Sequence, residues 1–510
     1  MHRPTMEPNL AHTLLHRAKY DPERIALIFE GEKLSYSDFG LRIMRQATLL
    51  KEKGVCVGDR VGFIGFNQPV FLETLYAANA IGAVFVPLNF RLTASELTYI
   101  VNDAGVHTLI CDDEMQNIMD PVKEQLCCQH YFGATNTLKG WRSLQDERKT
   151  AEPLDTIVSV DQHDTSIIMY TSGTTGLPKG AMLTHGNLMW NNFNSLLAFS
   201  SGNEDVSLMA APLFHIGGLN VLTLLCFTQG ATLLLFRNFD AGEVLKAFDE
   251  HKVTMMFGAP AMFLFMSQHE DFESTDFSRV NSFVCGGAAP SESLLKLYLG
   301  RGVSFCQGYG LTETAPFASF LSTEWSMDKI GSAGQAPMYT NLKIVGDNNQ
   351  TLAANERGEI CVKGPNIMKG YWNNPAASEE AIDGEGWFHT GDVGYLDEGE
   401  FLFICDRLKD MVISGGENVY PAEVESVLAG HEAIAEVAVL GTPDEKWGEA
   451  VIAVAALHAG CELTIKELRG FAESKLAKYK LPLHLHIMDV LPRNPAGKVL
   501  KFVIKEQLDL

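Results

Sequence analysis

Residues 171–180 form the segment with the strongest chemical character, and they read Thr-Ser-Gly-Thr-Thr-Gly-Leu-Pro-Lys-Gly. The glycines let the backbone turn tightly and point several N–H groups at one spot. Four hydroxyls add donors, and Lys179 adds a positive charge. Such a set of donors suits a polyphosphate, although the Walker A spacing is absent. A flexible surface loop is the alternative, but the apolar run 166–170 before it is typical of a buried strand.

Residues 307–314 offer groups for a base and a metal ion. Tyr309 stands between two glycines, so its ring could lie flat on a planar base. Glu313 could bind Mg²⁺, a hard cation that prefers carboxylate and phosphate oxygens. Taken alone, the segment is equally typical of a turn that leads into a helix.

Three further segments carry polar or glycine-rich turns. Residues 386–392 end on Asp392, which a tight turn could present to two ribose hydroxyls. Residues 414–418 contain two adjacent glycines, and residues 492–498 end on Lys498. Each of these segments, taken alone, is more typical of a turn or a solvated loop.

The composition bounds the class of protein. The 510 residues, 46% of them hydrophobic, allow about three domains or subdomains. The net charge of −23 argues against a general nucleic-acid partner. Ten cysteines without a Cys-x-x-Cys pair, and no apolar signal peptide, favour a cytoplasmic protein with reduced thiols. The most apolar stretch, 219–236, is interrupted by Asn220, Gln229 and Gly230, so we expect a buried helix and strand and no transmembrane segment.

The chain must position these groups on an α/β scaffold. Strand-like runs at 61–65, 83–88 and 107–111 alternate with helix-like stretches at 70–81 and 95–104. This alternation predicts a large N-terminal domain of layered, largely parallel sheets and helices.

The pattern of expected strands and helices changes near residue 395, after which these elements are short. We predict a boundary at about residue 408, with a large domain over 1–407 and a small α+β domain over 408–510. The elements expected here are strands at 400–404, 436–440 and 451–457 and helices at 421–428 and 465–479.

In their order, these segments resemble the adenylate-forming superfamily of acyl-CoA synthetases, adenylation domains and luciferases. Residues 211–218 and 286–290 belong to the same resemblance, which covers essentially the whole chain. It implies an ATP-dependent carboxylic acid–CoA ligase that uses Mg²⁺. The acid and ATP would form an acyl adenylate and pyrophosphate, and CoA would then release acyl-CoA and AMP.

The resemblance also implies roles for individual residues. Lys498, Thr312, Glu313 and His215 would be catalytic, and Glu313 would bind Mg²⁺. The small domain would be mobile about a hinge at Lys409. The ATP site would consist of Thr171, Ser172, Gly173, Thr174, Thr175, Gly176, Lys179, Gly287, Ala288, Gly308, Tyr309, Thr312, Asp392, Arg407 and Lys498. The acyl site would consist of His215, Phe257, Gly258, Gly286 and Gly310, and the CoA site of Gly415, Gly416, Trp447, Tyr479 and Lys480.

Two points of the resemblance stay open. Some relatives carry basic residues after the aromatic residue near the CoA phosphates, whereas this chain has Leu481-Pro482-Leu483. Either Lys480 serves alone or CoA binds differently. The acid is expected to be a medium- or long-chain fatty acid, with an aryl acid of the feruloyl, coumaroyl or o-succinylbenzoyl type as the alternative. A second carboxylate would need a cation, and His215 is the nearest polar candidate.

Three other classes of protein are alternatives to an acid–CoA ligase. A P-loop motor would release ADP, a non-catalytic acyl-binding relative would lack the phosphate-binding residues, and a luciferase would consume oxygen. The partners expected are therefore small molecules, namely the acid, ATP and CoA. A homodimer is expected only as the commonest oligomeric arrangement.

Overall fold

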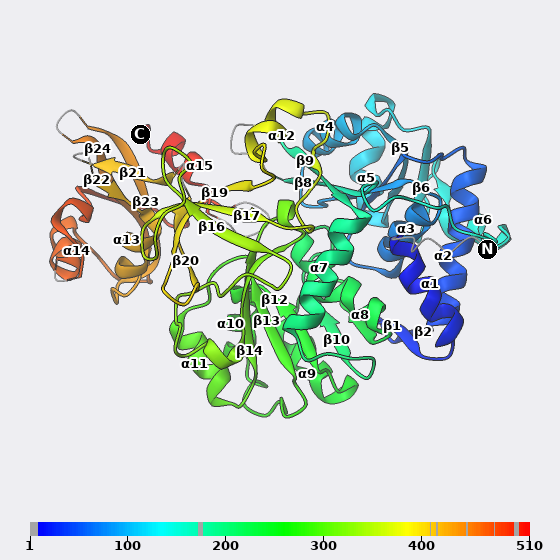
Figure 1. Cartoon of the computed structure of the whole chain (residues 1–510), viewed down its shortest axis with the longest axis horizontal. Coiled ribbons are helices and arrows are strands. Elements are labelled where there is room, and N and C mark those ends of the chain that lie inside the picture. The colour runs from blue at the N-terminus through cyan, green and yellow to red at the C-terminus, as the bar shows by residue number, and fades with distance from the viewer. Residues whose placement is uncertain are drawn as a thin grey trace. The chain divides into compact units, whose positions relative to one another are not determined.

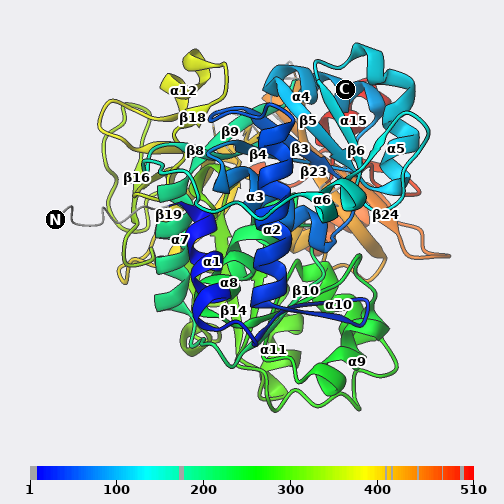
Figure 2. The ribbon, with the colours of Figure 1, turned by 90° about the vertical axis from the view of Figure 1, so that its right-hand side faces the viewer.

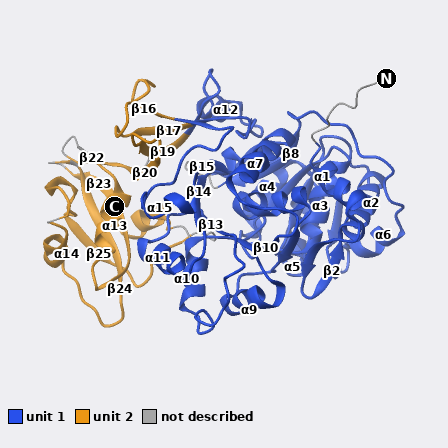
Figure 3. Ribbon diagram, turned by 60° about the horizontal axis from the view of Figure 1, so that its bottom comes forward, with its two compact units in different colours: residues 1–342, 362–389 blue, residues 343–361, 390–510 orange. Residues whose placement is uncertain are grey.

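The computed structural model describes residues 9–171, 177–407, 410–414, 417–444, 447–473, 475–493 and 499–510 (Figures 1 and 2). The side chains of residues 407, 417, 418 and 448 are not described. The chain forms two compact units (Figure 3). Unit 1 comprises residues 1–342 and 362–389, and unit 2 comprises residues 343–361 and 390–510. Residues 343–361 and 390–407 thus group with the C-terminal part, and the mobile-domain boundary at residue 408 stays a prediction.

The first sheet of unit 1 carries the strands that lead to Phe257, Gly286 and Tyr309. Its strands are β1 (Ile25–Phe29), β2 (Glu32–Ser35), β10 (Val206–Met209), β11 (Thr232–Leu235), β12 (Met255–Gly258), β13 (Ser282–Gly286), β14 (Phe305–Gly310) and β15 (Phe317–Leu321). Their order is β15-β14-β13-β12-β10-β11-β1-β2. Only the edge pairs β14–β15 and β1–β2 are antiparallel among these described strands.

The second sheet of unit 1 carries the strands that flank residues 172–176. Its strands are β3 (Arg60–Ile64), β4 (Val84–Leu88), β5 (Val106–Cys111), β6 (His130–Gly133), β7 (Arg142–Ser143), β8 (Thr165–Thr171), β9 (Lys179–Thr184) and β18 (Gly370–Tyr371). Their order is β18-β9-β8-β4-β3-β5-β6-β7. The pairs from β8 to β7 are parallel, whereas β8–β9 and β9–β18 are antiparallel. The prediction of largely parallel sheets is confirmed.

Helices accompany both sheets (Figures 1 and 2). They are α1 (Leu10–Tyr20), α2 (Tyr36–Glu52), α3 (Pro69–Ala80), α4 (Ala94–Ala104), α5 (Asp113–Met119), α6 (Leu144–Thr150), α7 (His185–Ala198), α8 (Leu224–Gln229), α9 (Ala241–His251), α10 (Pro260–Gln268), α11 (Glu292–Gly300) and α12 (Pro375–Ala381). Shorter turns are η1 (Asp120–Gln125), η2 (Gly218–Thr223), η3 (Thr312–Thr314) and η4 (Thr323–Trp325).

Local sequence explains where several elements begin and end. Pro69 occupies the first turn of α3, where its missing N–H is not needed. Thr93 and Glu96 form a capping box at the start of α4, and Gly105 ends it with a φ of 63°. The helices predicted at 70–81 and 95–104 are confirmed to within a residue at either end. No described helix is both long and apolar enough to cross a bilayer.

A four-stranded sheet is formed by the part of the chain between residues 341 and 407. Its strands are β16 (Asn341–Val345), β17 (Gly358–Lys363), β19 (Phe388–Leu396) and β20 (Leu402–Arg407), in the order β16-β17-β19-β20. The boundary between the units passes through β16, β17 and β19. The strand predicted at 400–404 begins two residues late. The reason is a turn in which Glu400 has a φ of 61° and Asp397 Oδ1 accepts from the Gly399 and Phe401 N–H groups.

The C-terminal residues of unit 2 form an α+β layer. Its strands are β21 (Val412–Ser414), β22 (Glu417–Val419), β23 (Ile434–Asp444), β24 (Gly448–Leu457) and β25 (His484–Ile487), with α13 (Pro421–Leu428), α14 (Ile465–Ala472), η6 (Lys478–Lys480) and α15 (Lys501–Gln507). The prediction of a helix over 465–479 is wrong in its length. Arg469 donates to the Pro482 carbonyl over 2.7 Å, and Leu476 and Leu481 enter the same core, so the chain turns back after Ala472.

Candidate active site

The strands β8 and β9, which flank the predicted polyphosphate segment, are antiparallel neighbours in the second sheet. β8 ends at Thr171, β9 begins at Lys179, and these two residues are direct partners in the antiparallel register. Ser172, Gly173, Thr174, Thr175 and Gly176 lie outside the described residues. Gly180 is needed for packing, because a Cβ there would lie 2.7 Å from Ile168 Cγ2 and 3.0 Å from Tyr170 Cζ. A strand, and not the helix of a Walker A loop, therefore follows the segment.

Tyr371 connects Lys179 with Glu313. The pairing of β18 with β9 sets Tyr371 opposite Ala181. Its ring centroid lies 5.3 Å from Lys179 Nζ, within the range of a cation–π contact. Its hydroxyl donates to Glu313 Oε1 over 2.9 Å, and burial raises its pKa, so it remains protonated and acts as a donor. The structure thus brings a cation of the predicted ATP site and the predicted Mg²⁺ ligand into contact with one tyrosine side chain.

The turn that carries Glu313 is held by distant main-chain contacts. The Met368 N–H donates to the Glu313 carbonyl over 2.8 Å, and Asn366 Nδ2 donates to the Thr314 carbonyl over 2.7 Å. Glu313 is buried in η3 and Thr312 begins that turn. Gly310 has no room for a side chain, because a Cβ there would collide with the Pro316 carbonyl oxygen. Gly310 therefore has a structural reason to be a glycine, namely its close packing against Pro316. The acyl-site role implied by the resemblance is a separate prediction.

The predicted adenine and acyl residues meet at the carboxyl ends of parallel strands. Gly286 on β13 is the register partner of Gly308 on β14, and Phe257 on β12 is the partner of Val284. A Cβ on Gly286 would lie 3.1 Å from the Phe257 ring. Parallel sheets place ligands at such strand ends. The remaining predicted residues of this group, Gly258, Gly287, Ala288 and Tyr309, lie on the same strands or directly after them.

Gly287 has a conformation that favours glycine. Its φ is 86°, and open space surrounds the position of a Cβ. The backbone directly after β13 is therefore accessible to a ligand, and a side chain there would be strained.

His215 is partly buried with a buried Nε2 atom, and its imidazole is electrically neutral near pH 7. Burial, together with the positive charge of Arg91, lowers its pKa to about 4. Among the described residues its Nε2 has no hydrogen-bond partner. Its ring centroid lies 4.4 Å from that of Phe214, and the Arg91 guanidinium lies 5.9 Å from the Phe214 centroid. Sequence reasoning placed no cation here, and the structure supplies Arg91.

The predicted ribose residues lie in unit 2. Asp392 is buried within β19, so the prediction of a tight turn there is wrong. β19 continues past Gly391 because the Gly391 N–H donates to Glu359 Oε1 over 3.0 Å and the Thr390 hydroxyl donates to the Ile360 carbonyl. Asp392 is the register partner of Arg407 on β20, whose side chain is not described.

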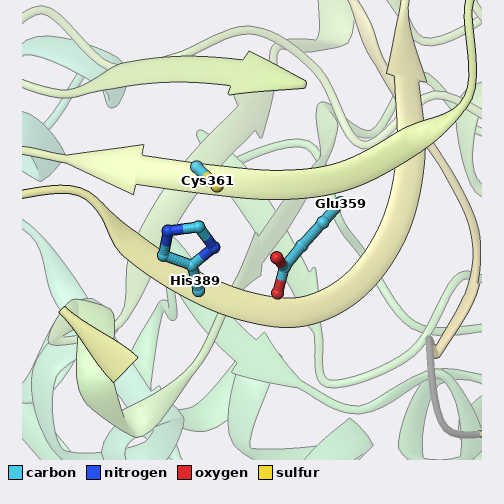
Figure 4. A group of neighbouring side chains, drawn as sticks. All are labelled: Glu359, Cys361 and His389. Carbon is cyan, nitrogen blue, oxygen red and sulfur yellow. The ribbon is translucent and has the colours of Figure 1, made fainter. Parts of the chain in front are cut away.

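Figure 4 shows Glu359 and Cys361 on β17 and His389 on β19. His389 belongs to unit 1, whereas the other two belong to unit 2, so we assign no site to this group. The His389 imidazole lies 3.6 Å from the Asp383 carboxylate of its own unit.

The predicted CoA residues are only partly described. Trp447 and Tyr479 are exposed, each with 40% of its surface accessible. Lys480 Nζ lies 2.6 Å from Glu423 Oε1, so its charge is already paired. Lys409, Gly415, Gly416 and Lys498 lie outside the described residues, and their roles stay predictions.

Sequence reasoning missed Tyr371 and Arg91. Neither lies in a segment of glycines and hydroxyls, and both reach the predicted site only through packing. The sequence offers one local signal for Tyr371, which is that this aromatic residue directly follows a glycine, Gly370.

The layered α/β unit, with Lys179 and Glu313 both in contact with Tyr371, agrees with the family that sequence comparison identifies. A sequence model of the AMP-binding enzyme family matches residues 14–372, and one of the AMP-binding enzyme C-terminal domain matches residues 423–498. The chain belongs to this family and is an acid–thiol ligase of the AMP-forming class. The expected adenylate-forming resemblance is confirmed.

Relatives cover nearly the whole chain. Feruloyl-CoA synthase of an Amycolatopsis species is 40% identical over 493 residues, which cover 97% of this chain and 98% of that protein. A long-chain-fatty-acid–CoA ligase of Mycobacterium tuberculosis is 35% identical over 501 residues, 98% of either protein. The structure of o-succinylbenzoate coenzyme A synthetase from Bacillus subtilis with ATP and magnesium ion has a TM-score of 0.87 at 34% identity, covering 97% of this chain and 99% of that one.

Proposed function

We propose that this ligase joins an aryl carboxylic acid with a polar ring substituent to CoA through an acyl adenylate. The grouping of Lys179, Tyr371 and Glu313 carries the ATP-dependent part of the proposal. It puts a positive charge at the end of the donor-rich segment and a carboxylate 2.9 Å from the hydroxyl of the same tyrosine. Residues 171–180 would hold the β- and γ-phosphates as the leaving pyrophosphate.

The remaining ATP contacts follow the strand ends. Tyr309 and the Gly287-Ala288 backbone would bind the adenine, and Thr312 would contact the α-phosphate. The register pair of Asp392 and Arg407 supports their joint role at the ribose. Lys498 would stabilise the charge that develops when the substrate carboxylate attacks the α-phosphorus. The mixed anhydride is itself the activated species, so the enzyme needs no nucleophile of its own.

Glu313 fits a magnesium ion. It is a buried carboxylate, a hard oxygen donor, next to the predicted phosphate site. When bound, Mg²⁺ would neutralise charge on the phosphate oxygens. Tyr371 would hold the orientation of the Glu313 carboxylate for this purpose.

The proposed class of acid depends on His215. A neutral imidazole whose buried Nε2 has no partner among the described residues suits an uncharged polar group, such as a phenolic hydroxyl. A fatty chain would leave this nitrogen unpaired, which costs about 1–3 kcal/mol. A phenolic acid thus replaces the fatty acid that we expected first from sequence. The 40% identity to a feruloyl-CoA synthase supports the same choice.

A carboxylate panel tests the proposal. The enzyme is incubated with ATP, Mg²⁺ and CoA, and AMP release is followed for 4-hydroxycinnamate, cinnamate, 2-succinylbenzoate and decanoate. We expect the hydroxylated acid to be used at least tenfold more efficiently than cinnamate, and His215→Phe to remove this preference. Preference for decanoate would assign the enzyme to fatty acids, and release of ADP would overturn the ligase reaction itself.

A fatty acid is the second candidate. The mycobacterial long-chain-fatty-acid–CoA ligase is similar over 98% of the chain. A fatty chain would contact apolar side chains such as Phe257 and would leave the His215 Nε2 without a partner.

A further inference from the structure

Helix α7 has its polar and apolar sides reversed relative to an ordinary surface helix. Asn187, Asn191 and Asn194 point into unit 1 and are buried. Asn187 Nδ2 donates to the Ile367 carbonyl over 2.7 Å, and Asn191 Nδ2 donates to the Asn220 carbonyl over 2.7 Å. Asn194 Oδ1 accepts from the Tyr339 N–H over 3.0 Å. These bonds fix the rotation of the helix, because turning it would leave buried amides unpaired.

The opposite side of α7 presents large apolar side chains to solvent. We call Trp190, Phe193, Leu196, Leu197, Met338 and Tyr339 the α7 face. Trp190 holds it together, since its ring centroid lies 5.7 Å from that of Phe193 and 5.0 Å from that of Tyr339. Figure 2 shows α7 on the left-hand side of the ribbon, beside α1.

The exposed apolar area of the α7 face is large enough to be compared with that of a protein–protein interface. The exposed fractions are 38% for Phe193, 40% for Leu196, 56% for Leu197, 72% for Met338 and 41% for Tyr339. Taking about 200 Å² for a fully exposed side chain of this size, the α7 face exposes roughly 500 Å². If all of it were buried, two such faces would remove about 1,000 Å² of apolar surface from water, which is the lower limit for a specific interface before any polar rim is counted.

Charge indicates which partner fits. α7 contains no Asp, Glu, Lys or Arg, whereas the whole chain carries a net charge of −23. An anionic membrane or a basic peptide would require charges that this face lacks. Two copies of a strongly acidic protein repel one another over most of their surface, and an uncharged aromatic face is where that repulsion is smallest.

We propose that the α7 face is the interface of a homodimer with two-fold symmetry, in which the α7 face of one copy packs on that of the other. Such an interface is self-complementary, so one patch serves both copies. Aromatic residues, Met and a lack of charge are the composition expected of its core.

The experiment measures the mass of the full-length protein in solution by light scattering and sedimentation. We expect a dimer of about 112 kDa, twice the chain mass of 56.1 kDa. The double variant Phe193→Lys/Leu197→Lys is expected to be a monomer with unchanged ligase activity per chain. Phe265→Lys on α10 is the matched control, since Phe265 is 54% exposed and lies outside the α7 face, and it should remain a dimer.

Three results would overturn the proposal. The first is a monomeric wild type at all concentrations up to about 100 μM, well above the dissociation constant of a stable dimer. The second is a double variant that dimerises like wild type, and Leu197→Glu alone repeats this test if the double variant does not fold. The third is a monomer whose α7 face is needed for binding to phosphatidylcholine vesicles, which would assign the face to a membrane.

Discussion

Replacing Tyr371 by Phe removes one oxygen atom from the proposed ATP site and keeps the ring. The lost group is the hydroxyl that donates to Glu313 Oε1 over 2.9 Å. The ring that lies 5.3 Å from Lys179 Nζ stays in place. The variant therefore separates the orientation of Glu313 from the contact with Lys179.

A hydrogen bond to a charged group contributes about 1.5–3 kcal/mol. If the bond orients Glu313 for Mg²⁺, Tyr371→Phe should slow acyl-adenylate formation by roughly 10- to 100-fold at limiting Mg²⁺. Saturating Mg²⁺ should restore part of the rate. Tyr371→Leu also removes the ring, and its KM for ATP should rise as well. The assay follows pyrophosphate release over a range of Mg²⁺ concentrations.

Tyr298→Phe is the matched control. It also removes a tyrosine hydroxyl, which donates to the Phe263 carbonyl over 2.7 Å in the aromatic core of unit 1. It should lower the free energy of unfolding by about 1 kcal/mol and leave the Mg²⁺ dependence unchanged. The positioning role of Tyr371 is refuted if Tyr371→Phe has the Mg²⁺ dependence of wild type, or if Tyr298→Phe shifts it equally.

Three further predictions concern the two half-reactions and pH. Lys498→Ala should slow adenylate formation by about 10²–10³-fold but still convert supplied acyl adenylate to thioester; normal pyrophosphate release would contradict this. Lys409→Pro, which fixes φ, should keep adenylate formation and abolish thioester formation, and equal loss of both would exclude the hinge. The pKa of His215 is about 4 in the folded protein, below its usual 6.5, so the unfolded chain binds more protons between these values. The free energy of unfolding should therefore fall by about 2 kcal/mol more between pH 7 and pH 5 in wild type than in His215→Phe, measured by urea titration; equal slopes would show that His215 is not buried as described.

Much of the fold could be predicted because the relevant patterns are local. The apolar run 166–170 lies within β8, and the stretch 70–81 became α3. The predictions that failed depended on contacts between distant residues. α14 ends early because Arg469 binds the Pro482 carbonyl, and Asp392 lies in a strand because Glu359 binds the Gly391 N–H.

Sequence by itself determined the reaction class, because the donor-rich segment and the later motifs follow one another in the order of the adenylate-forming superfamily, and that order can be read without any packing partner. Only the tertiary structure decided how that chemistry is supported. Tyr371 reaches Glu313 across 58 positions of sequence, burial sets the protonation of His215, and the buried asparagines turn an apolar helix side outward. Each of these depends on which atoms are neighbours in space, and residue order alone does not contain that information.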